Sequence, residues 1–408
     1  MPPTVAIVYL ALGVGVLFWV TTLRHPRIFG RFLQPVVGFV AMGPALGLPQ
    51  LLVAGALVTA VVAALGGLGP RLGWVGLALH LAAWMELLAY GLAVQRSLPR
   101  LDGEPVADED STWGTPPLKV RWTPFLTWWV GGDVRVTRDV PYHEVDGVRL
   151  KADIYQPGTP VPPRPPIVYV HGGGWIRGSR RHARFLARGL ADAGWTVFAV
   201  SYRKAPRFPL PAAIHDVKAG LAWVRAHATE WGALDAPPLM IGGSAGGHLT
   251  ALAALTPHRP DLQPGFEGAD TTVAGAVICY GVTDLEHAFE GGRNLPTAWF
   301  VERVVVRQRR LDVPETFAGL NPIKQRPPVL PPLLLVHGDR DDLVSPRLSS
   351  RFVGALREAG ATELHLLEVP EAPHAFDLVP SPLHQRAMRL ILAFFARVAA
   401  PPEAERSA

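Results

Sequence analysis

The chain has 408 residues, which is long for a single domain, so we expect at least two structural units. Its formal net charge of +5 comes without a lysine-rich run, which predicts no nucleic-acid partner. Cys279 is the only cysteine, so disulfides within the chain and CxxC metal sites are excluded, and its apolar neighbours predict a buried, inert thiol.

Uncharged apolar segments account for the high mean hydropathy of +0.20. Residues 5–23 form one such segment, which matches the ~20 residues that an α-helix needs to cross a bilayer, and they lack the features of a cleaved signal peptide. Residues 35–69 contain prolines and favour a re-entrant hairpin or two helices with a tight turn, and residues 73–94 form a further span. We predict an all-α transmembrane domain of three or four spans over residues 1–95.

The number of spans decides on which side of the membrane the rest of the chain lies. Six arginines flank the predicted spans: Arg24, Arg27, Arg31, Arg71, Arg96 and Arg100. With four spans, the first four of them share one side, and the positive-inside rule then places everything after residue 100 outside the cytoplasm. With three spans, Arg71 lies on one side of the membrane and the other five arginines lie on the opposite side, so the positive-inside rule places the residues after 100 in the cytoplasm. We favour four spans, in a membrane that is best explained as the plasma membrane.

Residues 96–133 are expected to form a linker and juxtamembrane segment, with three tryptophans in its stretch 120–132, and residues 399–408 a tail. Between them, residues 134–398 begin with two consecutive strands and then alternate short β-rich runs with amphipathic helical segments. The β-rich runs begin near residues 167, 196, 239, 274, 333 and 363. This alternation predicts an α/β fold with a mostly parallel sheet covered by helices and reactive groups at the carboxyl ends of the strands.

Three consecutive glycines, Gly172, Gly173 and Gly174, follow the first of these runs in the sequence VYVHGGGW. Unhindered backbone amides of this kind suit a bound phosphate, an oxyanion that forms during attack on a carbonyl, or a plain turn. The phosphate alternative is disfavoured because the chain has no GxxxxGK[ST] motif.

A GxSxG motif over residues 242–246 lies between an apolar strand and an Ala/Leu-rich helix, where it places the hydroxyl of Ser244 at the top of the sheet. A serine nucleophile needs an imidazole base and an orienting carboxylate. Asp341 and His374 each follow a later strand, in the chain order that this fold class uses, and the spacing HGxxD selects Asp341 over Asp339 and Asp342.

The serine motif decides how the three glycines are interpreted. Attack by Ser244 on an acyl carbonyl creates an oxyanion, and the glycine loop supplies backbone N–H donors at the position where this architecture holds them. We therefore predict an oxyanion hole built from Gly172, Gly173, Gly174 and the amide of Ala245.

The sequences HGGGW, GGSAGGH, HGDRDDLV and PHAF resemble the hormone-sensitive-lipase-like branch of α/β-hydrolase esterases over roughly residues 134–398. With its apolar N-terminus the chain is similar to membrane-anchored actinobacterial lipase/esterases and to isoprenylcysteine methylesterases. The resemblance implies hydrolysis of carboxylic esters through an acyl-enzyme, without a metal or an organic cofactor, and a structural role for Asp216. Two motifs depart from the branch: Gly243 replaces a common Asp, and residues 202–207 read YRKAPR instead of YRLAPE.

An insertion at about residues 284–325 interrupts the alternation and is expected to form a cap over the acyl pocket. Its Trp299, Phe300 and Val301 suit either an apolar acyl chain or plain packing of the cap. Expected partners are a small-molecule or lipid ester and a membrane. Two other functions remain open: acyl transfer through the same acyl-enzyme, and a non-catalytic membrane scaffold that retains the fold.

Overall fold

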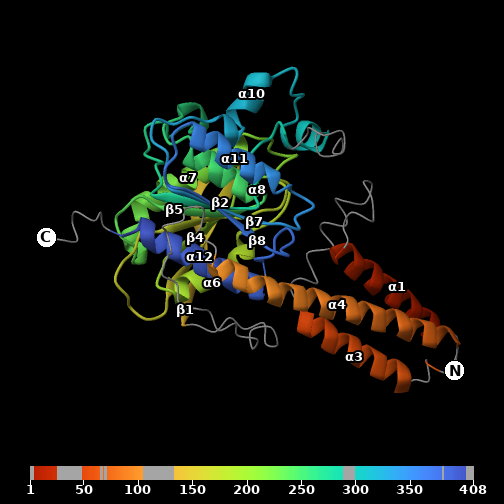
Figure 1. Ribbon diagram of the computed structural model, residues 1–408. Helices are drawn as coiled ribbons and strands as arrows, with labels where there is room; N and C mark the ends of the chain where they lie inside the picture. The colour runs from red at the N-terminus through yellow and green to blue at the C-terminus, as the bar shows by residue number, and fades with distance from the viewer. Residues whose placement is uncertain are drawn as a thin grey trace.

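The computed structural model describes residues 4–24, 48–64, 68, 71–103, 133–287, 299–378 and 381–400. Within these ranges, three long helices precede a domain built on one sheet (Figure 1). Part of the second apolar segment, residues 35–47, and the tryptophan-containing segment near residues 120–132 lie outside the described residues, as does most of the expected tail.

One sheet of eight strands organises the second domain, in the order β1-β2-β4-β3-β5-β6-β7-β8. The strands are β1 (Val134–Val145), β2 (Val148–Pro157), β3 (Ile167–Val170), β4 (Val197–Val200), β5 (Leu239–Gly243), β6 (Gly275–Cys279), β7 (Leu333–Gly338) and β8 (Leu364–Val369). The pairs β1–β2 and β2–β4 are antiparallel, and the pairs from β4 through β3 to β8 are parallel. The prediction of a mostly parallel sheet is confirmed.

The hairpin between β1 and β2 is tighter than its sequence suggested. The sequence HEVDG, residues 143–147, has the composition of a turn between two strands, but strand β1 continues to Val145, so only Asp146 and Gly147 form the turn. Both turn residues have positive φ, +50° and +68°, which matches the backbone twist of a two-residue hairpin turn.

Helices cover both faces of the sheet because side chains alternate between the faces along each strand (Figure 1). In β5, for example, Met240 faces one core, whereas Leu239 and Ile241 face the other. The first face carries α7 (Ala212–His227), α8 (Ala245–Ala254) and α11 (Arg347–Glu358), and the second carries α6 (Arg184–Asp192) and α12 (Pro382–Val398). Shorter helical turns lie at Arg180–Ala183, Ala228–Trp231, Pro260–Leu262, Val301–Val305, α10 (Pro314–Gly319) and Pro322–Lys324.

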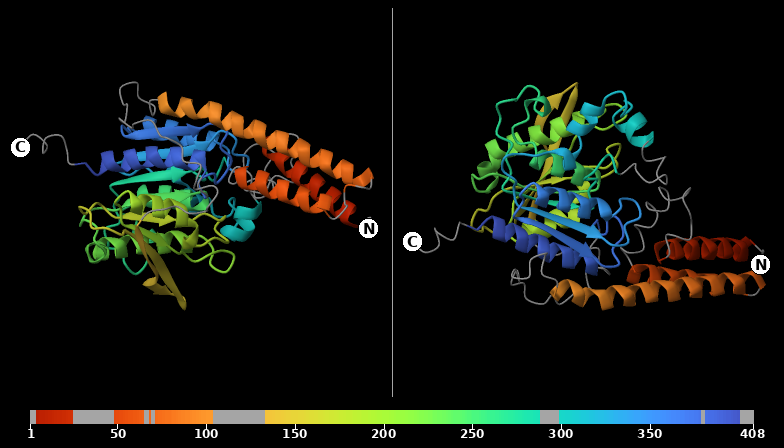
Figure 2. Two further views of the ribbon diagram at one scale, coloured as in Figure 1. Left: turned by 90° about the horizontal axis from the view of Figure 1, so that it is seen from below. Right: turned by 45° about the horizontal axis from the view of Figure 1, so that its top comes forward.

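The N-terminal helices are α1 (Thr4–Arg24), α3 (Leu48–Ala64) and α4 (Arg71–Gly103). They pack on one another: the Tyr9 ring stacks on His80 at a centroid distance of 4.4 Å, and its hydroxyl lies 2.8 Å from Thr59 Oγ1. Helix α4 passes the boundary that we expected at residue 95 and lies against α12 (Figure 2).

Among the described residues, only Gly73–Val94 within α4 is long and apolar enough to cross a membrane, and the apolar stretches Ile7–Leu17 and Gly55–Ala64 are shorter. A domain of three or four membrane spans therefore stays a prediction.

Candidate active site

Ser244 lies at the sharp turn between β5 and α8, with φ +57° and ψ −122°, a backbone conformation that a serine rarely adopts. A Cβ on Gly242 would collide with the carbonyl oxygen of Gly246, and one on Gly246 would collide with that of Val170. Glycine on both sides is thus required for the chain to turn here. The strain of about 1–3 kcal/mol at such a residue persists only because the surrounding structure holds it.

A chain of two hydrogen bonds joins the three side chains that the sequence analysis selected. The imidazole of His374 donates through Nδ1 to Asp341 Oδ2 at 2.7 Å, because a carboxylate can only accept. This leaves Nε2 to accept from the Ser244 hydroxyl, at 2.9 Å. His374 and Asp341 are buried, and Ser244 is partly exposed. The arrangement can move the serine proton onto an imidazole that the carboxylate orients.

The Asp341 carboxylate is also bound by its own loop. Its Oδ1 accepts the amides of Leu343 at 2.9 Å and Val344 at 2.8 Å. Burial by itself raises the pKa of Asp341, but the charge and hydrogen bonds of His374 and the hydrogen bond of His337 outweigh burial and lower the pKa to about 2. The carboxylate is consequently ionised at neutral pH.

His337 is a partner of Asp341 that the sequence analysis missed. Its Nε2 lies 3.2 Å from Asp341 Oδ2 and 3.0 Å from the carbonyl oxygen of Val344, while Nδ1 lies 2.7 Å from Ser349 Oγ. A neutral ring protonated on Nε2 satisfies all three contacts. The motif HGxxD contains this histidine, but no sequence rule tied the ring to the carboxylate.

The neighbouring acidic residues make different contacts. Asp339 accepts the amide of Glu371 through Oδ1 at 2.7 Å, and Asp342 is exposed. Of these three aspartates, Asp341 is the one with a hydrogen bond to His374.

The glycine loop passes close to the serine. A Cβ on Gly172 would lie 2.7 Å from the carbonyl oxygen of Gly243 and 3.2 Å from Ser244 Cβ, so only glycine allows this approach. Gly173 and Gly174 follow with φ of +123° and +61°. Ala245 is the first residue of α8, and the amides of a first helical turn have no acceptor within the helix. Gly172 and Ala245 therefore border Ser244, and Gly173 and Gly174 continue the loop.

A buried histidine connects the glycine loop to the insertion. Trp175, directly after the glycines, has φ +60° and donates its indole N–H to His248 Nδ1 at 3.3 Å. His248 in turn donates from Nε2 to the carbonyl oxygen of Leu320 at 2.9 Å. Burial lowers the pKa of His248 to about 4, so the ring is neutral and both of its nitrogens are used. No sequence motif indicates this link.

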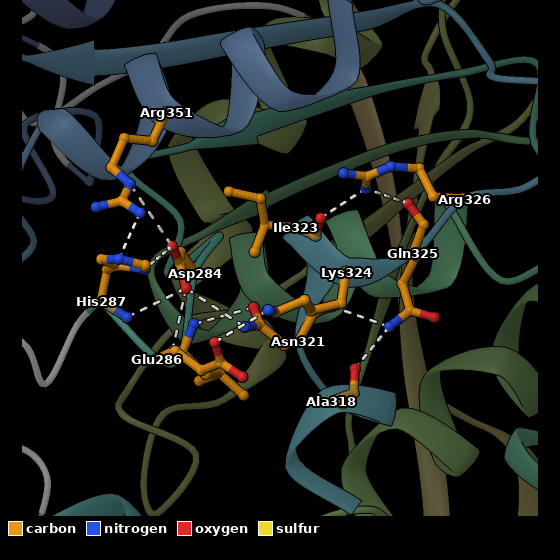
Figure 3. A network of polar contacts seen from close by, with 11 residues as sticks. Asp284, Glu286, His287, Ala318, Asn321, Ile323, Lys324, Gln325, Arg326 and Arg351 are labelled. Carbon is orange, nitrogen blue, oxygen red and sulfur yellow. Dashed lines mark hydrogen bonds and ion pairs between the residues drawn. The ribbon is translucent and has the colours of Figure 1, made fainter. Parts of the chain in front are cut away.

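Asp284 and Asn321 close the insertion at its base (Figure 3). The amide of Leu285 donates to Asn321 Oδ1 at 3.0 Å, and Asn321 Nδ2 donates to Asp284 Oδ1 at 3.3 Å. Around this pair, further polar contacts involve Glu286, His287, Lys324, Gln325, Arg326 and Arg351. Hydrogen bonds thus join the start of the insertion, which follows β6, to the part near its end that contains Asn321.

The three insertion residues singled out in the sequence lie in different places. Trp299 is 61% exposed, and Val301 belongs to the core of the domain. Phe300 lies at the glycine loop, with its ring 3.8 Å from where a Cβ on Gly174 would be. Of these three residues, Phe300 is the one beside the glycine loop, whereas Val301 follows the packing alternative.

Other predicted residues have structural surroundings. Cys279 is buried on β6, as predicted, and burial raises the pKa of its thiol. Asp216 accepts the amide of Arg203 at 2.7 Å and pairs with its guanidinium, which agrees with a structural role. Within the part of the chain that the structure describes, no three His, Cys, Asp or Glu side chains gather in a group that could hold a metal ion.

A mostly parallel sheet, a serine at the turn after β5, and an aspartate and a histidine after β7 and β8 define the α/β-hydrolase fold. The sequence model of the BD-FAE family matches residues 152–356, and the chain belongs to this family. The resemblance to α/β-hydrolase esterases is thereby confirmed.

Individual relatives of the chain are also named as esterases. The chain is 40% identical over 245 residues to Esterase LipQ of Mycobacterium tuberculosis, covering 59% of this chain and 58% of that protein. It is 30% identical over 247 residues to the probable isoprenylcysteine alpha-carbonyl methylesterase ICME of Oryza sativa, covering 57% and 56%. The chain thus spans little more than half the length of these curated relatives. The propionate-bound esterase Est2 of Thermogutta terrifontis is 27% identical, with a TM-score of 0.54 over 66% of this chain and 97% of that one.

Proposed function

We propose that this protein is a serine carboxylesterase that hydrolyses carboxylic esters through an acyl-enzyme on Ser244. The observation that carries the proposal is the hydrogen-bonded chain from Ser244 through His374 to Asp341. Membership of the BD-FAE family and similarity to esterases support it. The substrates are small carboxylic esters, and esters of lipids are included if the protein is attached to a membrane.

In acylation, Ser244 Oγ bonds to the ester carbonyl carbon while its proton passes to His374 Nε2, and the carbonyl electron pair moves onto oxygen. When the oxyanion collapses, the carbon–oxygen bond to the alcohol breaks and the alcohol leaves with the proton from Nε2. Water then repeats the sequence on the acyl-enzyme and releases the acid. Asp341 stays ionised throughout and stabilises the imidazolium.

The backbone amides of Gly172, Gly173, Gly174 and Ala245 are the proposed donors to the oxyanion. The close approach of Gly172 to Ser244 supports this role, as does the start of α8 at Ala245. Removal of one oxyanion-hole donor costs about 10²–10³ in kcat in serine hydrolases, so the loop is expected to contribute much of the rate.

We further propose that the N-terminal helices attach the esterase to a membrane. Large apolar side chains are exposed on all three of them, and a protein surface in water rarely carries so many together. They include Ile7, Val8, Leu12 and Val14 on α1, Leu57, Val58 and Val61 on α3, and Trp74, Val75, Leu81, Met85, Leu88 and Leu92 on α4.

The proposed activity is tested with p-nitrophenyl esters of graded acyl length and the detergent-solubilised full-length protein. We expect hydrolysis by the wild type and a loss on the order of 10⁶ in kcat for Ser244→Ala. Equal activity of the two proteins would contradict the assignment of the nucleophile. Product analysis with an added alcohol distinguishes the acyltransferase alternative, since transfer yields a new ester in place of the acid.

A further inference from the structure

Helix α4 reaches the loop that carries His374. The hydroxyl of Tyr90 donates a hydrogen bond of 2.8 Å to the carbonyl oxygen of Glu371, a residue of the loop between β8 and His374. Tyr90 and Val94 are only 8% and 6% exposed, and both belong to the same core as α6 and α12 of the hydrolase domain. The C-terminal end of the apolar stretch Gly73–Val94 of α4 is thus packed into the catalytic domain (Figures 1 and 2).

Glu371 is where the loops of the two proposed catalytic partners meet. Its amide donates to Asp339 Oδ1 at 2.7 Å, and its carboxylate accepts from Arg340 Nη2 at 3.2 Å. The amide of Arg340 also donates to the carbonyl oxygen of Ala372 at 3.1 Å. Asp339 and Arg340 directly precede Asp341, so the loop of the aspartate and the loop of the histidine are joined at this residue.

The backbone of Glu371 needs these contacts. Its φ is +61°, in the left-handed region, which costs a non-glycine residue roughly 1–2 kcal/mol. Such a conformation persists where the surroundings hold it. The amide of Glu371 is held by the aspartate loop and its carbonyl by Tyr90, so one of the two backbone restraints comes from α4.

We infer that α4 is a positioning element of the active site: Tyr90 holds Glu371, and through it the loop of His374, against the loop of Asp341. This inference rests on the proposed esterase function. A displacement of about 1 Å in a catalytic group can cost on the order of 10²-fold in rate, so a restraint on this loop affects turnover more than substrate binding. Helix α4 is then a structural part of the hydrolase domain in addition to any role in membrane attachment.

The first test removes the hydroxyl of Tyr90 in the full-length protein. For Tyr90→Phe we expect kcat toward a short, water-soluble ester to fall about 5- to 10-fold, as for loss of one buried hydrogen bond, with KM within about twofold of the wild type. The matched control is Tyr9→Phe, which removes a tyrosine hydroxyl that contacts Thr59 within the N-terminal helices, and it should leave kcat unchanged. An unchanged kcat in Tyr90→Phe would overturn the inference.

The second test disturbs the packing of α4. Val94→Asn places a polar group in the buried contact, whereas Leu92→Asn places the same group on the side of α4 where Leu92 is 42% exposed. Hydrogen exchange of the backbone amides in residues 370–376 should accelerate in Val94→Asn and Tyr90→Phe but not in Leu92→Asn.

Thermal unfolding of all four variants separates positioning from general stability. A lower Tm in Tyr90→Phe with unchanged kcat and unchanged exchange in residues 370–376 would assign the contact a merely structural role and refute the coupling. If the wild type hydrolyses no ester, the proposed function fails, while the exchange measurement still decides whether α4 restrains the loop.

Discussion

Asp339, Asp341 and Asp342 lie within four residues of sequence but differ in what each carboxylate contacts. The carboxylate of Asp341 bonds to His374 Nδ1 and to two amides of its own loop, that of Asp339 bonds to the amide of Glu371, and Asp342 is exposed. An Asn at 341 can no longer hold the imidazole in the required tautomer or stabilise the imidazolium. An Asn at 339 can still accept the Glu371 amide.

We therefore expect Asp341→Asn to lower kcat by about 10⁴, and Asp339→Asn and Asp342→Asn to lower it by less than about tenfold. Steady-state kinetics on one soluble ester measures all three variants. A loss at Asp342→Asn equal to that at Asp341→Asn would move the assignment to Asp342.

The surroundings of Gly243 explain why the chain has glycine where the esterases that it resembles often have Asp. A Cβ at this position would lie 2.6 Å from the hydroxyl oxygen and 2.9 Å from Cζ of Tyr280. Tyr280 donates to the buried carboxylate of Asp377, and its ring meets the His374 ring at a centroid distance of 4.7 Å and an angle of 65°. A larger residue at 243 would displace the ring that packs on the imidazole.

Gly243→Ala should accordingly lower kcat by on the order of tenfold, because the Tyr280 ring must move and the His374 ring loses its neighbour. Gly354→Ala serves as the control, since a Cβ on Gly354 in α11 meets nothing within 4 Å. If both alanine variants retain wild-type kcat, Tyr280 does not position His374.

The residues that could be found from the sequence are those with a local signature. Ser244 stands in a strand-turn-helix motif, and Asp341 and His374 each follow a recognisable strand, so motif and chain order were sufficient to select them. His337 lies within HGxxD, but the motif does not tell that its ring bonds to the carboxylate. The contacts of His248 and Tyr280 join segments that are distant in the sequence, and only the folded sheet brings these segments together.

At the scale of elements, the strands were predictable where an apolar run is bounded by turn residues, as for β3 and β5. The extent of β1 and α4 was not. Strand β1 includes residues 143–145, which resemble a turn in sequence, because they pair with β2. Helix α4 extends beyond its apolar part and packs against α12. In both cases tertiary contacts override the local pattern.

The insertion supplies a prediction on acyl length. Since the Phe300 ring lies 3.8 Å from the position of a Cβ on Gly174, it limits the room beside the glycine loop. Phe300→Ala should raise the ratio of kcat/KM for octanoyl over acetyl esters by about tenfold, which corresponds to the burial of about two more CH₂ groups at about 0.8 kcal/mol each. Trp299→Ala removes a side chain that is 61% exposed and should leave the ratio unchanged. Equal ratios in the two variants would place the acyl chain elsewhere.

At the scale of the whole molecule, the apolar surface of α1, α3 and α4 predicts membrane attachment. The full-length protein should remain in the membrane fraction after extraction with alkaline carbonate, because burial of these side chains in lipid does not depend on charge. With four spans, a C-terminal reporter should be accessible from outside the cell. Release of the protein into the carbonate supernatant would contradict attachment through these helices, and a reporter that is accessible only from inside would exclude four spans.

Covalent labelling tests most directly whether Ser244 is the nucleophile of an esterase. Incubation of the full-length protein with a fluorophosphonate, followed by proteolysis and mass spectrometry, should find one phosphonyl group on the peptide that contains Ser244, and none in Ser244→Ala. A protein that hydrolyses esters but carries the label on another residue, or that remains labelled in Ser244→Ala, would contradict the account.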